Sequence, residues 1–292
     1  MPSTQQLKSR IRSVKSTKQI TKAMQMVAAS KMRRSQDATK ASAAYALAAN
    51  DLLTYLAGQG ATDDHPLFVK RAIKSRLIIL IAADKGLAGA YNSNVYRKYI
   101  ELLQRDDDRG IRNHTITVGR KASQFASRLR DTDVIGSYDD LPDHPGGLTF
   151  HTILNSACDM FREQQVDAVT VVYTHFISSI TQEATWMRLL PAGTAPLSNP
   201  EEMRNTEVES RFEPDIPGVL DAVALRLVGS RLFQALLDAR ASEHSMRMLA
   251  MKNATDNANS LVDDLTLEMN KARQAAITQE LSEISAGVEA MK

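Results

Sequence analysis

The chain has 292 residues, enough for one large domain or two small ones. Apolar residues make up 43% of it and aromatic residues only 5%, a composition that favours helix-on-helix packing over a β-rich core. The longest apolar run, 77–83, is far too short to span a bilayer, and a single cysteine excludes an intrachain disulfide.

The net charge of +2 hides an uneven distribution of charge along the chain. Residues 1–40 carry ten Lys or Arg and one acid, whereas residues 255–292 carry seven acids and three bases. Ends of opposite sign can attract each other or meet charged partners. The basic, Ser-rich start is also typical of a mitochondrial transit peptide, but the helical pattern continues past any presequence, so we favour a helix of the folded protein.

The first expected element is a long helix. No Gly or Pro occurs within residues 3–57, Ser3 and Gln6 fit a capping box, and Gly58 is the expected stop. One stripe of apolar or small residues follows the helical period, and most Lys and Arg lie off it. Its members are Leu7, Ile11, Val14, Thr21, Met24, Ala28, Ser35, Ala38, Ser42, Tyr45, Ala49, Leu52 and Leu56.

The middle of the chain has the pattern of an α/β domain. Residues 76–83 form a continuous apolar run typical of a buried strand. Alternation of such strands with helices predicts a parallel sheet with crossover helices, and the last strand is expected to be antiparallel to its predecessor. The other expected strands are 115–118, 134–135, 168–173 and 181–189, and the expected helices are 95–103, 122–129 and 153–161.

The loop 84–89, Asp-Lys-Gly-Leu-Ala-Gly, follows the first strand, where a Rossmann fold binds phosphate. It is not GxGxxG, and the chain contains no P-loop motif. We therefore favour a turn that needs glycine for its geometry, and expect neither nucleotide nor another cofactor. The six histidines lack metal-ligand spacing, and Cys158 has no activating neighbour, so we expect neither a metal site nor a catalytic site.

The last expected element is a second long helix. Asp215 and Pro217 are start signals, and no Gly or Pro interrupts 230–286 before Gly287, the expected end. A stripe with a mean spacing of about 3.7 residues predicts a nearly straight helix. The stripe consists of Ala250, Ala254, Asn257, Leu261, Leu265, Met269, Ala272 and Ala276.

The two helices, of roughly 80 and 105 Å, are longer than the diameter of about 45 Å of a compact globule of this mass. Their narrow stripes must therefore cover each other. The expected fold is α/β with a long antiparallel coiled coil, in which the N- and C-terminal helices pair as a shaft. The helices are 1–58 and 214–292, and a Rossmann-like α/β domain at 70–213 is inserted between them.

Two surfaces off the stripes are candidates for contacts with partners. For the basic N-terminal helix three interpretations stay open: nucleic acid or anionic lipid, a solvated face, or an acidic protein partner. Aromatic residues do not interleave with the charges, which weakens the nucleic-acid interpretation. Residues 277–284, ITQELSEI, are interpreted as polar all round, and their Thr, Gln and Glu side chains can hydrogen-bond to a surrounding protein.

Long strings at both ends resemble one family. KQITKAMQMVAASKM at 18–32 is similar to the N-terminal signature of the gamma subunit of F-type ATP synthase. MKNATDNA at 251–258 and NKARQAAITQELSEI at 270–284 are similar to its C-terminal signature. The resemblance covers the layout of the whole chain and is strongest over residues 1–45 and 215–287.

The resemblance implies a central-stalk rotor subunit that couples proton flow to ATP synthesis or hydrolysis. In this family the terminal helices stand inside the ring of alpha and beta subunits, which carries the catalysis. The α/β domain lies against epsilon and the membrane c-ring, and delta is a further partner. The implied subunit is non-catalytic, cofactor-free, not self-associating and not bound to nucleic acid. It is peripheral on the cytoplasmic face of the bacterial inner membrane, with the mitochondrial matrix less favoured. The alternative is a static coiled-coil adaptor with an α/β head.

The resemblance also implies roles for individual residues. It favours an acidic partner for the basic helix, namely a lever on beta. The implied contacts with the alpha/beta ring are Lys22, Met24, Arg33, Arg34, Arg273, Gln274, Thr278, Gln279 and Glu280, and Glu213 is the implied contact with the rotor ring. Residues 86–90 are Gly-Leu-Ala-Gly-Ala, where the family has Gly-Leu-Cys-Gly-Gly. A lone cysteine also excludes the regulatory cysteine pair of the plastid form.

Overall fold

The computed structural model describes residues 3–58, 65–129, 132–140, 142, 146–192 and 216–290. Its contacts divide the chain into two compact units. The terminal unit combines residues 1–29 with 247–292, and the larger unit is 30–246. Two long helices, α1 (Thr4–Gly58) and α5 (Ile216–Ala290), each contribute to both units.

The larger unit contains a five-stranded sheet in the order β3-β2-β1-β4-β5, in which the first four strands are parallel and β5 is antiparallel to β4. This confirms the expected mixed sheet and the antiparallel last strand. The strands are β1 (Ser75–Ile81), β2 (Arg112–Val118), β3 (Asp133–Tyr138), β4 (Ala168–Phe176) and β5 (Gln182–Leu190). The helices between them, α2 (Tyr91–Asp107), α3 (Arg120–Ala126) and α4 (Leu148–Arg162), also overlap the expected ones.

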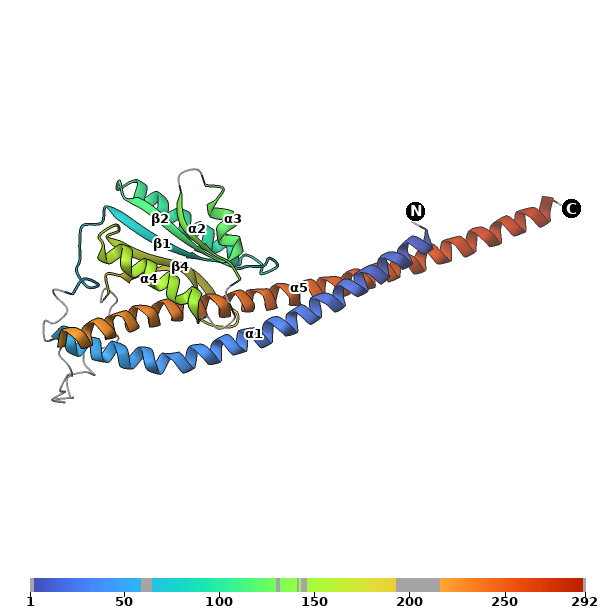
Figure 1. The fold of residues 1–292 in the computed structure, drawn as a ribbon. Helices are drawn as coiled ribbons and strands as arrows, with labels where there is room; N and C mark the ends of the chain where they lie inside the picture. Colours follow the sequence, from blue (N-terminus) through green and yellow to red (C-terminus); the bar gives the residue numbers. More distant parts are fainter. Residues whose placement is uncertain are drawn as a thin grey trace. The chain divides into compact units, whose positions relative to one another are not determined.

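Successive residues of β1 face opposite layers, because side chains alternate along a strand. Ile78 and Leu80 pack with residues of α2 and α3 in one apolar cluster. Leu77 and Ile79 pack in a second cluster with α4 and with residues 224–239 of α5. Figure 1 shows α2 and α4 on opposite sides of the sheet. Burial on both faces explains why β1 is apolar throughout rather than alternating.

The terminal unit begins with the predicted capping box. The backbone N–H of Gln6 donates to Ser3 Oγ at 3.2 Å, and the backbone N–H of Ser3 donates to Gln6 Oε1 at 3.1 Å. α1 then buries residues from the predicted stripe. The buried members in this unit are Leu7, Ile11, Thr21 and Ala28. The two helices run side by side here (Figure 1), and Leu7 packs in one cluster with Leu265 of α5.

The stripe predicted for α5 is wrong in its first half. Asn257 and Leu261 are exposed, whereas Met251, Thr255 and Ala258 are buried. The inward positions 251, 255, 258, 262, 265, 269 and 272 alternate gaps of four and three residues. The mean spacing of these inward positions, about 3.5 residues, is that of a left-handed coiled coil. The expectation of a nearly straight helix was therefore based on the wrong positions. Small residues occur on both faces of this helix, and apolar character alone therefore did not locate the buried face.

The ends of the long helices only partly match the expectation. α1 ends at Gly58 as predicted, and Pro217 is the second residue of α5. Proline is tolerated in a first turn, where no helical acceptor is available for its missing N–H. Gly287 does not end α5, which continues to Ala290. A helix interior accepts glycine at a cost of about 1 kcal/mol, so the residue is a weak stop signal.

A buried pair of threonines joins the two helices of the terminal unit. The hydroxyl oxygens of Thr21 and Thr255 lie 2.8 Å apart, and both residues are buried. We expect Thr21→Val to lower the free energy of unfolding by about 1 kcal/mol, because it leaves the other hydroxyl without its cross-helix partner. Replacing both threonines by valine should cost less than the two single changes added together. Urea unfolding followed by circular dichroism measures these values.

The matched control for this pair is Thr17→Val, which removes an exposed hydroxyl from the same helix. It should change the free energy of unfolding by less than about 0.5 kcal/mol. Strictly additive effects of the two buried substitutions would show that the hydroxyls do not interact.

Candidate protein-binding surface

The end of α5 has no packing partner within the part of the chain that the structure describes. Every residue from 273 to 286 is exposed, and Figure 1 shows α5 continuing past the start of α1. Ile277, Leu281 and Ile284 are 50%, 61% and 64% exposed. Their spacing of four and three residues places them on one face of the helix. The interpretation of this segment as polar all round is therefore wrong, because it carries an exposed apolar stripe.

Polar side chains flank the apolar stripe at the end of α5. All five residues implied there as ring contacts are exposed: Arg273, Gln274, Thr278, Gln279 and Glu280. Thr278 Oγ1 donates to the Gln274 carbonyl at 3.0 Å, and Gln279 Nε2 donates to Glu283 Oε1 at 2.9 Å. These bonds stay within one helix. The side chains can therefore exchange them for bonds to another protein at little cost.

The basic end of α1 also exposes apolar side chains. Lys22 is exposed, and its Nζ donates to Gln25 Oε1 at 3.4 Å, whereas Met24 is half-buried. Met26 is 60% exposed, and Ile20 and Val27 are also more than half exposed. Sequence reasoning singled out Met24 and missed these three residues. The sequence could have indicated them, because they are large apolar residues that lie off the stripe predicted to be buried.

The other implied contacts lie elsewhere. Arg33 and Arg34 are exposed on the part of α1 that belongs to the larger unit. Glu213 lies outside the described residues. The structure thus places Lys22, Met24 and the five α5 residues in one unit, and places the two arginines in the other.

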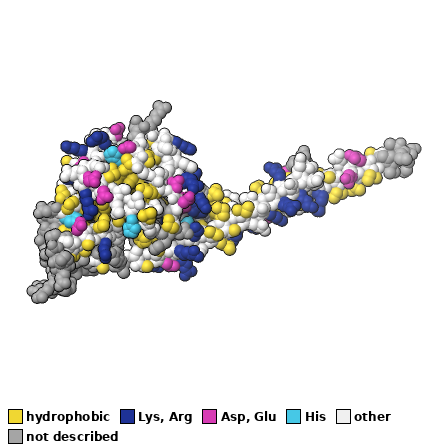
Figure 2. All heavy atoms as spheres, in the orientation of Figure 1, with side chains coloured by type: hydrophobic (Ala, Val, Ile, Leu, Met, Phe, Trp, Pro, Cys, Tyr) yellow, Lys and Arg dark blue, Asp and Glu magenta, His cyan; other side chains and the backbone are white. Residues whose placement is uncertain are grey.

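Charge on the terminal unit is separated along its length. Residues 4–29 of α1 carry six Lys or Arg and no acid. Figure 2 shows basic side chains gathered where the two helices run together and acidic ones toward the free end of α5. Charged groups around exposed apolar residues are typical of the rim of a protein-binding surface.

Asp84, the first residue of the loop 84–89 that was the other candidate from the sequence, is held by donors from three other segments. Asp84 Oδ1 accepts the backbone N–H groups of Arg120 and Asp140, both at 3.0 Å, and Asp84 Oδ2 lies 3.1 Å from Arg240 Nη2. Gly89 has a φ of 57°, a conformation that favours glycine, so the expected need for glycine is confirmed at this position. Leu87 has a φ of 63°, so the turn also places a residue with a side chain in the left-handed region. The chain's own carboxylate therefore engages three of the donors at this edge of the sheet.

Cys158 and two histidines, which could serve as a nucleophile or as metal ligands, lie in surroundings that give them other roles. Burial raises the pKa of the Cys158 thiol to about 11, which disfavours the reactive thiolate. His114 Nδ1 and His175 Nδ1 lie 2.6 and 2.7 Å from the carboxylates of Asp133 and Asp238. Among the described residues, no group of three or more His, Cys, Asp or Glu is placed to hold a metal ion.

Comparison with known proteins gives one consistent result. The ATP synthase family model matches residues 3–291. An ATP synthase gamma chain of Stenotrophomonas maltophilia is 40% identical over the full length of both chains. The chain belongs to the ATP synthase gamma chain family. A second gamma chain, from Macrococcus caseolyticus, is 38% identical over the same extent.

A solved structure agrees with this assignment. It is the central stalk and c-ring of the Tetrahymena thermophila mitochondrial ATP synthase, with a TM-score of 0.59 and 27% identity, covering 80% of this chain and 99% of that one. The family resemblance inferred from the terminal strings is confirmed, and this gamma chain is a central-stalk rotor subunit. None of its described helices is long and apolar enough to cross a membrane.

Proposed function

We propose that this gamma chain transmits rotation from a membrane c-ring to a ring of alpha and beta subunits, and that the chemistry of ATP takes place on those subunits. The observation that carries the proposal is the apolar stripe of Ile277, Leu281 and Ile284 on a helix end that no other described part of the chain covers. Three large apolar residues in a row on one face favour burial in another protein.

The apolar stripe and the polar residues beside it are both compatible with a helix that rotates inside a ring of other subunits. Apolar contact is non-directional, so a surrounding ring can slide past the stripe with little change in free energy. Hydrogen bonds depend on angle, so the flanking polar residues can favour particular orientations. We assign this second role to Arg273, Gln274, Thr278, Gln279 and Glu280, and contacts with acidic groups of the ring to Lys22, Met24, Arg33 and Arg34.

The remaining assignments rest on family membership. We place Glu213 against polar loops of the c-ring and the α/β domain near epsilon, with delta as another member of the assembly. The full-length relatives named above are bacterial, which supports a peripheral position on the cytoplasmic face of the plasma membrane.

A reversible crosslink from the shaft to the ring tests the rotor. Lys22 is exposed, so Lys22→Cys can carry a photocrosslinker joined through a cleavable disulfide without disturbing the helix pair. In the assembled complex, illumination should stop ATP hydrolysis in proportion to the fraction crosslinked, because a rotor bonded to its stator cannot turn. Cleavage of the linker should restore the rate. The native Cys158 does not interfere, because it is buried with a raised pKa.

The matched control places the covalent bond inside the shaft. Thr21→Cys with Thr255→Cys can form a disulfide between the two helices, since the native hydroxyl oxygens lie 2.8 Å apart. This bond should leave turnover unchanged, because both helices rotate together. Full turnover with the shaft crosslinked to the ring would instead support the static adaptor.

A further inference from the structure

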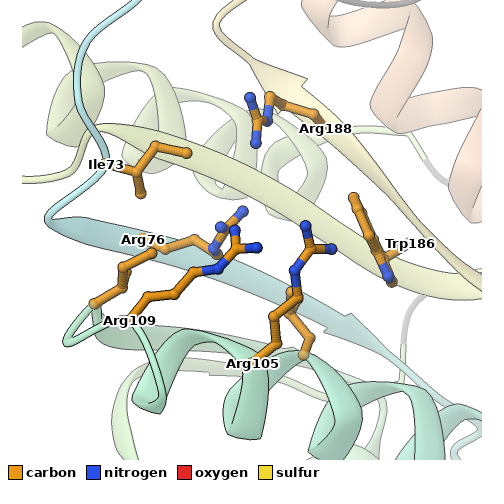
Figure 3. A pocket seen from close by; sticks show the side chains of 8 residues that line it. Ile73, Arg76, Arg105, Arg109, Trp186 and Arg188 are labelled. Atoms are coloured by element: carbon orange, nitrogen blue, oxygen red, sulfur yellow. The ribbon is translucent and has the colours of Figure 1, made fainter.

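A pocket lined by four arginines lies in the larger unit, away from the surfaces described above. Its volume is about 300 Å³, and Figure 3 shows the arginine side chains converging on it. Arg76 comes from the amino end of β1, and Arg188 comes from β5. Arg105 lies in the last turn of α2, and Arg109 follows that helix. The remaining lining residues are Ile73, Leu102, Ile111 and Trp186.

The strand pairing explains why these residues meet. Arg76 of β1 pairs with Ala168 of β4, and Thr170 of β4 pairs with Arg188 of the antiparallel β5. Arg76 and Arg188 therefore lie at the amino edge of the parallel strands. A Rossmann fold binds its ligand at the opposite, carboxyl edge, where Asp84 accepts two backbone hydrogen bonds.

Among the described residues, only Arg76 of the four arginines forms an ion pair. Asp106 is fully buried, and its carboxylate accepts Arg76 Nε at 2.6 Å and Arg76 Nη2 at 3.1 Å. No described carboxylate lies within 4.0 Å of the guanidinium nitrogens of Arg105, Arg109 or Arg188. Within the described ranges, three of the four arginines of the pocket therefore form no ion pair, although the Asp106 carboxylate also acts on Arg188 from a longer distance.

The surroundings of the arginines increase their electrostatic attraction for an anion. Burial lowers the pKa of Arg188, and the positive charges of Arg76 and Arg105 lower it further, while the Asp106 carboxylate opposes them in part. The Arg105 guanidinium lies over the Trp186 ring, 5.6 Å from its centroid, which restrains both side chains. Apolar walls reduce the local dielectric, so an anion in this pocket interacts more strongly than one on an open surface.

We propose that this pocket binds a small anion made of linked phosphate groups with about three negative charges, of which pyrophosphate is the simplest. Guanidinium forks match phosphate oxygens two at a time, and several such forks converge here. A single phosphate carries about two negative charges at neutral pH, which leaves part of the positive charge unmatched. The inference rests on the pocket alone and is independent of the rotor role.

The full-length chain contains its own reporter for the test, because Trp186 is the single tryptophan. Titration with pyrophosphate should change its fluorescence, and calorimetry measures the same affinity without relying on the indole. At fixed ionic strength, pyrophosphate and tripolyphosphate should bind at least about tenfold more tightly than orthophosphate or citrate. Orthophosphate equal to pyrophosphate would overturn the proposal. Citrate equal to pyrophosphate would also overturn it, because the pocket would then select charge rather than linked phosphates.

Three substitutions connect the binding to this pocket. Arg188→Gln and Arg109→Gln should each weaken pyrophosphate binding about tenfold, because each removes one charge-assisted contact. Arg97→Gln, at an exposed position of α2 outside the pocket, should leave the affinity unchanged and is the matched control. Arg109 is exposed, so Arg109→Gln is expected to fold and tests the proposal even if Arg188→Gln does not fold. An equal loss in the Arg97 variant, or no loss in the Arg109 variant, would contradict the assignment.

Discussion

Asp106→Ala is expected to lower the free energy of unfolding of the larger unit by about 3–5 kcal/mol. Asp106 is fully buried, and its carboxylate holds the buried Arg76 guanidinium by two hydrogen bonds. Without it, Arg76 keeps one described partner, Thr170 Oγ1 at 2.9 Å, while other arginines line the same pocket. A buried guanidinium without a counter-charge is strongly unfavourable. Urea unfolding monitored by the fluorescence of Trp186 reports on this unit.

Two further variants separate the ion pair from other effects of the substitution. Asp107→Ala removes the next carboxylate along the chain, which is exposed, and should cost less than about 0.5 kcal/mol. Replacing Arg76 by methionine and Asp106 by leucine together should restore much of the stability, because no unpaired charge then stays buried. If Asp106→Ala proved as mild as Asp107→Ala, the pair would contribute little to the fold.

The architecture of the chain could be predicted because its signals are local. The apolar run at the first strand, the alternation with helices and the long intervals without Gly or Pro each follow from side-chain periodicity. The capping box of Ser3 and Gln6 required only a spacing of three residues. Such features depend on neighbours in sequence, so one sequence was enough to place the elements.

The features that sequence reasoning missed depend on residues that are distant in the sequence. The inward face of α5 is decided by what packs against Met251 and Ala258, and many small residues make both faces look similar. Arg76 and Arg188 meet only through the pairing of β1, β4 and β5. On α1, Met26 and Val27 belong to the terminal strings that identified the family, but their exposure is a property of the packed helices.

Asp84→Ala should also be strongly destabilising, by about 2–4 kcal/mol, because one carboxylate joins three segments of the larger unit. Asp84 Oδ1 accepts two backbone N–H groups, from the start of α3 and from the residues after β3, and Asp84 Oδ2 pairs with Arg240 of α5. Alanine leaves the two N–H groups without this acceptor, at a cost of about 1–3 kcal/mol each where they are shielded from water. Urea unfolding of the full chain at pH 7.5 measures the loss.

Asp84→Asn separates the contribution of the two backbone hydrogen bonds from that of the ion pair with Arg240. Asparagine keeps an oxygen at the Oδ1 position, so both backbone hydrogen bonds can persist while the ion pair with Arg240 is lost. Arg240 also lies 3.2 Å from Glu243, which moderates the cost of that loss. We therefore expect the asparagine variant to lose about 1 kcal/mol, well below the loss for alanine. Equal losses in the two variants would show that the ion pair, rather than the backbone hydrogen bonds, carries the contribution.

The pH dependence of stability distinguishes the same two contributions. Burial alone would raise the pKa of Asp84, but the N–H groups of Arg120 and Asp140 and the charge of Arg240 outweigh it, so the pKa lies below its ordinary value. A depressed pKa in the folded state means that the unfolded chain binds the proton more readily. The stabilisation is therefore complete above the ordinary pKa of about 3.9 and is lost as the pH falls through the lower folded value.

The wild-type chain should lose stability more steeply below about pH 5 than Asp84→Asn, which has no proton to bind at this position. Parallel curves for the two chains would mean that other carboxylates account for the acid sensitivity. A steeper wild-type curve would show that the charge of Asp84, at the edge where related α/β folds bind phosphate, stabilises the gamma chain itself.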